Sequence, residues 1–503
     1  MTILSTLNTL TRPKIRPMAI LTVLAYSLPV SASDDTANVK SLDDRHAQEL
    51  LSVAQITPLP TIVATSSTPT DADSDTGIIT LSQDELLAQP QLLAHAFGSA
   101  LAYGQVSAVQ YLLPLYQAHD QPDDALIWWA QALLAQHQGK FGTAIEHYRH
   151  LIAKHPEHNT IRLQLAIALF YDRQYDAAKG QLQKLESQSN LSPIISPHIT
   201  HYLTLIDKID DWQLTGGINY IQDQNINNAP TNPNLSEHWT AQEAQSAHGI
   251  GAHVGIAKKH TLAHGYQLDG DLHLGAKYYH DAKSYNEATG KLSIGITHHD
   301  AHHAVRLAPY LEHTYYAGGH SQNNPSAKLE HFSQTKGLSL SWQYTPHPQW
   351  QSTVLLDYAR PRYQTRTHLD GETYFTQASL AHAPSAMQQW QLGINYTHAD
   401  TQDKDDSYHR YGVRASWQQE WAHGISTQLD LGYAHRRYHA PMPIFNQTQS
   451  NHEYHIQGSI WHRNIHFMGI TPRLTWQYQH QNSNIALYEY RKNHAFVELS
   501  KRF

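Results

Sequence analysis

Histidine is the residue type in this sequence with the greatest potential for chemistry. The chain contains 38 histidines, and four of them surround one tight turn, where His298 and His302, and His299 and His303, are each four residues apart. Imidazoles can bind zinc or haem iron. A structural metal site needs about four convergent ligands at fixed spacing, and this turn adds only Asp300. We therefore expect these and most other histidines to be polar lining, interface or turn residues, with no metal and no cofactor.

Motifs for catalysis are missing from the sequence. Serine, histidine and aspartate are abundant, but no Gly-x-Ser-x-Gly elbow, phosphate loop, dinucleotide fingerprint or metalloprotease helix occurs. The chain has no cysteine, which excludes disulfides, thiolate nucleophiles, Fe–S clusters and a lipid-modified N-terminal cysteine. We predict that the protein is not an enzyme.

The elements that position these side chains are alternating strands, beginning near residue 211 and continuing to Phe503. Residues 212–220, 338–344 and 390–397 each alternate apolar and polar side chains, so each strand has one apolar and one polar face. A soluble β-sandwich would show the same alternation. Strands of about 10 residues or more, however, match the length needed to cross a bilayer. The apolar faces also end repeatedly in tryptophan or tyrosine, as in the interfacial girdles of membrane barrels.

The connections between the strands alternate in length, which is typical of outer-membrane barrels with long surface loops and tight periplasmic turns. Thirteen connections predict a 14-stranded antiparallel barrel spanning residues 211–503, with both ends in the periplasm. We expect short connections near residues 259–263, 300–301, 346–348, 383–386, 422–423 and 463–464. Long connections are expected near 223–244, 281–289, 317–327, 361–371, 400–406 and 440–450, with a brief one near 481–483. Mean hydropathy is −0.53, as expected when half of each strand is polar.

The C-terminus carries a candidate signal for barrel insertion. Leu499 and Phe503 lie on the apolar face of the last strand, and a terminal Phe closing an alternating strand resembles the signal that the insertion machinery reads. Lys501 stands where an apolar residue is more usual, so the match is partial. We expect outer-membrane lipids and the insertion machinery to be partners.

The N-terminus has the layout of a secretory signal peptide. Arg12, Lys14 and Arg16 precede an apolar run that ends in small residues at 31–33. Its removal would leave a mature chain of net formal charge −11, which disfavours nucleic acid as a partner. Residues 34–80 are expected to form a flexible linker, since their central part is rich in Thr, Ser, Pro and Asp.

Residues 81–210 read as an all-α module with an internal repeat. Phe141 and Tyr175 are 34 residues apart, as are Pro122 and Pro156, a period typical of tetratricopeptide (TPR) helix pairs. A third, degenerate unit is expected around residues 97–116, and a generic helical bundle is the alternative. Stacked helix pairs present a concave face that usually holds a peptide or protein. The candidate client-binding residues on that face are Trp128, Trp129, Tyr148 and Tyr171.

This order of elements resembles the surface lipoprotein assembly modifier (Slam) family. The most specific local resemblance lies at the barrel entrance, where the strand Gly-Gly-Ile-Asn-Tyr at 216–220 precedes a loop containing Asn225, Asn227, Ala229 and Pro230. The resemblance implies a translocon component that delivers specific lipoproteins, or related haem-scavenging proteins, across the bacterial outer membrane. It places the TPR-like module in the periplasm, where a client surface lipoprotein or secreted protein would be received, with periplasmic chaperones as further candidate partners.

Two other transport functions stay open at this stage. Exopolysaccharide exporters also join TPR repeats to a barrel, but they usually carry more repeats and a lumen of one charge. A diffusion porin would leave the helical module unexplained. A rigid 14-stranded barrel is narrower than the 16-stranded porins, so a folded client would need an opened seam, unfolding or partner proteins.

Overall fold

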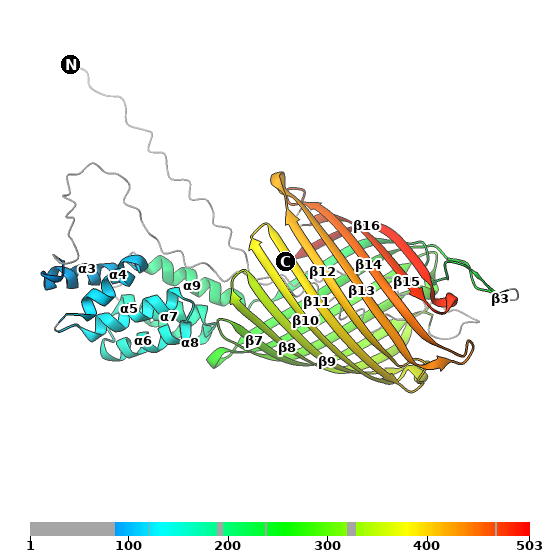
Figure 1. Cartoon of the computed structure of the whole chain (residues 1–503), viewed down its shortest axis with the longest axis horizontal. Coiled ribbons are helices and arrows are strands. Elements are labelled where there is room, and N and C mark those ends of the chain that lie inside the picture. The colour runs from blue at the N-terminus through cyan, green and yellow to red at the C-terminus, as the bar shows by residue number, and fades with distance from the viewer. Residues whose placement is uncertain are drawn as a thin grey trace, which may run out of the picture.

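The computed structural model describes residues 86–119, 121–188, 195–236, 239–318, 328–467 and 470–502. The expected signal peptide, the linker and Phe503 lie outside the described residues. A helical module lies at one end of a long barrel, and the strand β3 in the first loop lies at the opposite end (Figure 1). Within the described part of the chain, no helix combines the length and apolarity needed to cross a membrane.

The module consists of three helix pairs followed by a single helix. Apolar residues at helical spacing give each helix one buried stripe. The pairs repeat after 34 or 35 residues, which confirms the predicted TPR-like period, and the first pair is the expected degenerate unit. The helices are α3 (Pro90–Ala102), α4 (Val106–Gln117), α5 (Asp124–His137), α6 (Phe141–Lys154), α7 (Asn159–Tyr171), α8 (Tyr175–Glu186) and α9 (Ser196–Ile209).

Each pair turns between its two helices through the same cap. Gly104, Gly139 and Arg173 follow α3, α5 and α7 with positive φ angles of 64°, 77° and 60°. The next residue in each turn donates its backbone N–H to a carbonyl near the end of the first helix, at 2.9 Å in all three cases. This is the Schellman motif, in which a left-handed residue satisfies the last carbonyls of a helix. Arg173 thus occupies a conformation for which glycine is better suited.

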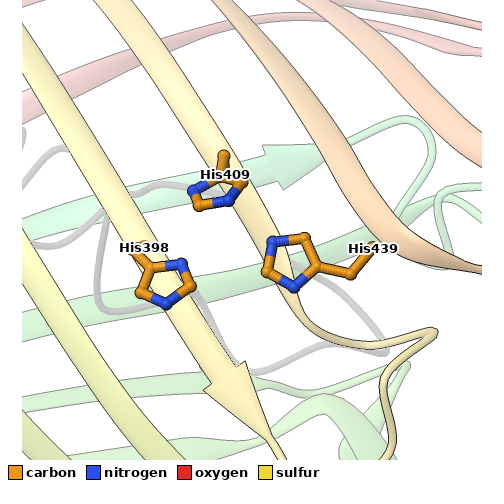
Figure 2. Close-up of side chains that lie close together, drawn as sticks. All are labelled: His398, His409 and His439. Atoms are coloured by element: carbon orange, nitrogen blue, oxygen red, sulfur yellow. The ribbon is translucent and has the colours of Figure 1, made fainter.

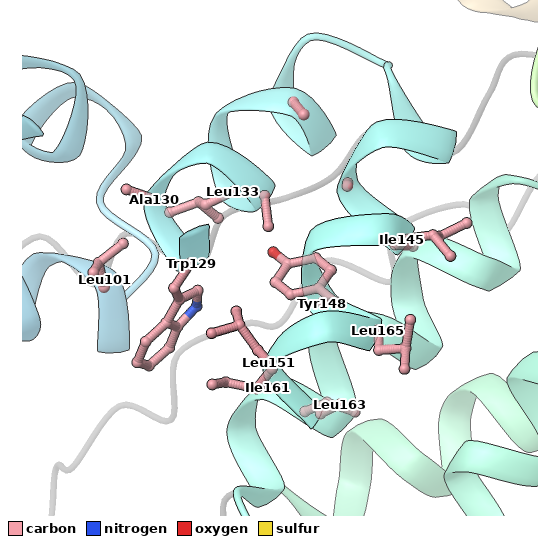
Figure 3. Packing of buried hydrophobic residues seen from close by; sticks show 14 of the residues in the cluster. Leu101, Trp129, Ala130, Leu133, Ile145, Tyr148, Leu151, Ile161, Leu163 and Leu165 are labelled. Atoms are coloured by element: carbon pink, nitrogen blue, oxygen red, sulfur yellow. The ribbon is translucent and has the colours of Figure 1, made fainter. Parts of the chain in front are cut away.

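Large aromatic side chains fill the space between the helices. Tyr148 is fully buried and donates its hydroxyl hydrogen to Gln136 Oε1 at 3.0 Å. Leu151, Ile161 and Leu165 surround the same region (Figure 3). The single cluster continues from α3 to α9, as expected when each repeat is stabilised by its neighbours.

Fourteen strands form the closed antiparallel barrel, in the order β1-β16-β15 and so on down to β4. Two short strands, β2 (Asn234–Ser236) and β3 (Trp239–Thr240), pair outside it. The barrel strands are β1 (Gln213–Asp223), β4 (Ala247–Thr261), β5 (Tyr266–Tyr279), β6 (Glu287–His299), β7 (His303–Tyr316), β8 (Glu330–His347), β9 (Trp350–Tyr363), β10 (Gly371–Ser385), β11 (Gln388–Thr401), β12 (Tyr408–Glu420), β13 (Ile425–Met442), β14 (Gln447–His462), β15 (Thr471–Ser483) and β16 (Tyr490–Arg502).

Polar and apolar side chains are placed in the barrel in the reverse of their arrangement in a soluble protein. Large apolar side chains such as Ile250, Leu340 and Ile394 are exposed on the outer face, whereas Asn395 and Gln477 are buried inside. An apolar exterior with a polar interior is the arrangement that a lipid surround requires. The sandwich alternative is therefore wrong.

Most predicted connections are confirmed, and three are corrected. The brief connection predicted near 481–483 lies inside β15, which ends at Ser483, and the chain instead turns between Ser483 and Tyr490. The stretch predicted as a long loop at 440–450 is mostly strand, because β13 and β14 continue their ladder to Met442–Gln447 after a register shift. The predicted tight turn at 463–464 is longer, since β14 ends at His462 and β15 begins at Thr471. The strand pairing continues through residues that are typical of loops, such as Pro441. The composition of residues 440–450 therefore led to a wrong prediction of where β13 ends and β14 begins.

The cap geometry gives opposite expectations for two nearby glycines. Gly139→Ala should destabilise the module by about 1–2 kcal/mol, because an L-residue is strained at its φ of 77°. Gly142→Ala should stabilise it by about 0.5–1 kcal/mol, because this position inside α6 has open space around it. Native-state proteolysis of the module in the full-length protein measures both effects. Equal signs for the two substitutions would contradict the cap assignment.

Candidate functional site: the docked module and the barrel seam

The helical module packs directly on the periplasmic turns of the barrel. Ala301, in the turn between β6 and β7, is buried within the same apolar cluster as the helices. His302, next to it, places Nε2 3.1 Å from the carbonyl oxygen of Gly139 and Nδ1 3.0 Å from that of Thr345. One cap turn of the module is thereby joined to two barrel hairpins.

A second set of contacts fixes the end of the module to β4. The Asp210 carboxylate follows α9 and accepts hydrogen bonds from the backbone N–H and the hydroxyl of Thr261, the latter at 2.8 Å. Lys258 donates to the backbone carbonyl of Asp210. Because β1 begins three residues after Asp210, these bonds fix the helical module to the strand that starts the barrel.

The third cap turn also faces the barrel. Tyr175 packs its ring 5.7 Å from that of His299. The Asp172 carboxyl lies against the backbone of Ala301, and burial raises its pKa. This turn therefore adds a ring contact and a partly buried carboxyl to the interface between the module and the barrel.

The four histidines around this turn do not converge on one point. His299 and His302 contact the module, as described above. His298 packs against Tyr266, and His303 stacks on Trp342 and Tyr344. Their roles are interface and girdle contacts around the periplasmic turn, as the sequence led us to expect.

Three of the four predicted client-binding aromatics lie inside the module. Trp129, Tyr148 and Tyr171 are buried in its core, so they support the fold and are not available to contact a client. Trp128 is partly exposed, with His150 edge-on to its ring and Lys154 Nζ 4.3 Å above it. Client binding stays a prediction for Trp128 alone.

Two exposed aromatics on the first helix pair escaped the sequence reasoning. Tyr103 is 77% exposed and Tyr111 is 58% exposed. The sequence does indicate that Tyr111 is exposed. Val109, Leu112 and Leu115 form the buried stripe of α4, and Tyr111 lies off that stripe. Single exposed aromatics are ordinary, but two on neighbouring elements are better placed to contact a partner than the buried ones.

The predicted motif loop folds back on itself at the extracellular end of β1. Asn225 holds Ala229 through a pair of hydrogen bonds, donating Nδ2 to its carbonyl at 2.9 Å and accepting from its N–H at 2.8 Å. Asn227 binds the segment that leads back to β4 in a similar way. Its side chain accepts a hydrogen bond from the Gln245 N–H at 2.9 Å and donates one to the Glu243 carbonyl at 2.8 Å. Both asparagine side chains therefore replace backbone pairing in this loop.

The same loop is anchored by apolar packing and by β16. Ile226 is fully buried against Ile221, Ala247 and Tyr279. Beyond the partly buried Pro230, the backbone N–H of Thr231 donates to the Glu489 carbonyl at 2.8 Å. The motif thus forms an ordered cover that connects the end of β1 to the start of β16.

The seam at which β1 meets β16 has the shortest ladder of the described barrel. It runs only from Thr215–Arg502 to Asn219–Glu498. The other edge of β1, in contrast, pairs with β4 along its full length, from Gln213–Ala257 to Asp223–Ala247. The extracellular half of the seam, from Tyr220 outward, is therefore not closed by a continued ladder between the described strands.

A buried ion pair bridges the seam beyond the end of the ladder. Lys492 Nζ on β16 lies 3.3 Å from Asp223 Oδ2 at the end of β1, and both side chains are fully buried. Asp223 also accepts from the backbone N–H of Asn225 at 2.8 Å. We call the Asp223–Lys492 pair the latch, since it joins β1, β16 and the motif loop at one point.

Charged side chains in the lumen form ion pairs. Arg410 and Arg436 both contact the Glu453 carboxylate at 2.9 Å, and Arg306 contacts Asp269 and Asp271. Towards the extracellular side a cavity of about 310 Å³ remains, lined by residues including Arg366, Arg410, Arg436, Tyr438 and Asn228. This space is too small for a folded protein.

Of the two residues of the predicted insertion signal, the structure places one. Leu499 lies on the exposed apolar face of β16 and pairs with Ile218 across the seam. Phe503 lies outside the described residues. The role of both residues in insertion stays a prediction.

Comparison with known proteins identifies the family. The family model described as surface lipoprotein assembly modifier matches residues 212–503, and the model of its N-terminal TPR repeats matches residues 79–182. A surface lipoprotein assembly modifier from Pasteurella multocida is 34% identical over 90% of this chain and 91% of its own length.

Two further relatives cover a similar share of the chain. Surface lipoprotein assembly modifier 1 from Haemophilus influenzae is 37% identical over 84% of this chain and 87% of its own length. A hemophilin secretion modulator from Acinetobacter baumannii is 24% identical, over 82% and 86% respectively. Both domains of the protein are thus matched in the same order, and the chain belongs to the surface lipoprotein assembly modifier family.

Proposed function

We propose that this protein delivers particular lipoproteins, or related haem-scavenging proteins, across the outer membrane to the cell surface. The observation that carries the proposal is the docking of a protein-binding type of helical module on the periplasmic mouth of an outer-membrane barrel, through Ala301, His302 and Asp210. A client held by the module would be held at the mouth of the barrel. The names of the relatives from Pasteurella multocida and Acinetobacter baumannii support delivery of this kind of client.

The partners follow from this role. The client contacts the module through exposed aromatics, for which Trp128, Tyr103 and Tyr111 are the candidates. Periplasmic chaperones would keep the client from folding before passage, and lipids and the insertion machinery act on the barrel. No catalytic step is part of the proposal.

The route that the geometry favours is the seam between β1 and β16. Buried polar side chains such as Asn395 and Gln477 face the lumen, and the cavity of about 310 Å³ described above is too small for a folded protein. The seam has a short ladder, and its extracellular half is held by the latch and the motif loop. Opening there exposes fewer unpaired backbone groups to lipid than opening any other strand pair.

The two competing transport functions fit the lumen less well. An exporter of a charged polysaccharide would favour a lumen of one sign, whereas here arginines pair with carboxylates, as at Arg410–Glu453 and Arg306–Asp269. A diffusion porin would need an open aqueous path, and it would give the docked module no task.

Surface display tests the proposed function. Intact cells that express this protein with candidate lipoproteins from its own genomic neighbourhood should display one candidate at the surface, detected by antibody without permeabilisation. Deleting residues 81–210 should leave an inserted barrel but abolish display. Display by the deleted form would contradict the role of the module, and absence of display for every candidate would favour polysaccharide export.

A reversible lock on the seam tests the route. The chain has no native cysteine, so Asn219→Cys with Glu498→Cys places a single cross-link at the last paired position of the β1–β16 ladder. Oxidation should reduce client display at least tenfold, and dithiothreitol should restore it.

The matched control is a lock between strands that stay paired. Gln391→Cys with Ser416→Cys joins β11 to β12 at facing positions and should leave display unchanged. Normal display through an oxidised seam lock would show that the seam does not open, while the delivery function itself would stand.

The latch gives a separate prediction about stability. Lys492→Met leaves the buried Asp223 carboxylate without this partner, so the barrel should lose about 3–5 kcal/mol of stability. The temperature at which the folded barrel unfolds in SDS, read by gel mobility, measures the loss. Arg463→Met, which removes a mostly exposed partner of Glu420, should cost less than about 1 kcal/mol. Equal losses would mean that the latch is no stronger than a surface pair.

A further inference from the structure

Three histidines far apart in the sequence meet on the outer face of the barrel near its extracellular rim. His398 lies near the end of β11, His409 near the start of β12 and His439 near the end of β13. Each can offer a ring nitrogen within 4.8 Å of those of the other two. Figure 2 shows the three rings gathered over adjacent strands.

The register of the sheet forces this meeting. His398 and His409 are direct cross-strand partners, and His439 follows Tyr438, the partner of Tyr408. Inward-facing residues alternate with these three, since Arg410, Arg436 and Tyr438 line the lumen cavity. Opposed side chains on one face of an antiparallel pair have Cβ atoms about 5 Å apart, which is a suitable distance for two imidazoles to share one ligand.

We propose that His398, His409 and His439 form a binding site for a divalent transition metal of the zinc type. Neutral imidazole is a common ligand for such ions. Zn–N bonds of about 2.1 Å in tetrahedral geometry hold the nitrogens about 3.4 Å apart. The nitrogens must therefore approach one another by up to about 1.4 Å, which rotation of these partly exposed side chains supplies.

Neighbouring groups prepare the site. Tyr396 Oη lies 2.7 Å from His409 Nδ1, so when Nδ1 donates to the hydroxyl, the Nε2 lone pair is left for the metal. A hydrogen bond of this kind orients a metal-binding imidazole. The Asp400 carboxylate interacts electrostatically with His398 and His439. In the structure Asp400 is paired with Lys404. The fourth position around the metal would therefore be filled by water, or by Asp400 after it leaves that pair.

A metal at this point would join three strands at the membrane surface. The site needs no part in delivery, because β11, β12 and β13 lie away from the seam in the strand order. Its expected effect is to clamp this wall of the barrel at the rim. The proposal is therefore independent of the proposed function.

Metal titration of the full-length protein, purified in detergent without a histidine tag, tests the site. Zn²⁺ should bind with one equivalent that His409→Gln weakens at least tenfold. Co²⁺ should give the visible absorption of a tetrahedral nitrogen site, which Zn²⁺ displaces. Zn²⁺ should also raise the temperature at which the folded barrel unfolds in SDS, and His409→Gln should abolish this rise.

The matched control separates this site from the many other histidines. His452 lies at the same rim and stacks on His435 at 4.6 Å, so it belongs to a pair without a third imidazole in the described cluster. His452→Gln should leave both the tight equivalent and the thermal shift unchanged. Unaltered binding in His409→Gln, or an equal loss in His452→Gln, would overturn the proposal.

Discussion

The closure of the β-sheet is the constraint on which this structure depends. A strand edge cannot find hydrogen-bond partners in lipid, so a sheet that crosses a membrane must pair its first and last strands. Here that pairing is short, from Thr215 to Asn219, and the buried Asp223–Lys492 pair holds the strands beyond the end of the ladder. A barrel closed in this way separates most easily at the seam between β1 and β16. The motif loop, through Asn225 and Ile226, covers that seam.

The same constraint explains what the sequence predicts well. Period-2 alternation with aromatic ends requires strands with one lipid-facing side, so the 14-stranded barrel was predictable without any long-range information. The 34-residue spacing also predicted structure well. Residues one repeat apart occupy equivalent positions in successive helix pairs, as the turn residues Gly104, Gly139 and Arg173 show. A pattern with a fixed period predicts the geometry of the element that bears it. The length of a loop follows no such period, which is why the loop at 440–450 was predicted too long.

The sites were less predictable because they depend on register between distant strands. Trp129, Tyr148 and Tyr171 have the composition of a binding face, but packing between α5, α6 and α7 buries them. Asp223 and Lys492 are 269 residues apart, and no local pattern relates them before the sheet closes. The turn with four histidines drew attention because they are adjacent in sequence. It is His398, His409 and His439, from three different strands, that share one face.

The barrel thus has two walls with different properties. On one side, β1 and β16 share a short ladder next to the strand to which the helical module is fixed through Asp210 and Thr261. Away from it, β11, β12 and β13 are paired along most of their length and carry the three histidines. Movement of β1 would be coupled to the module through α9, because only two residues separate Asp210 from β1. A client that arrives at the module could then act on the seam without disturbing β11, β12 and β13. A metal bound by the three histidines would hold these strands together more firmly.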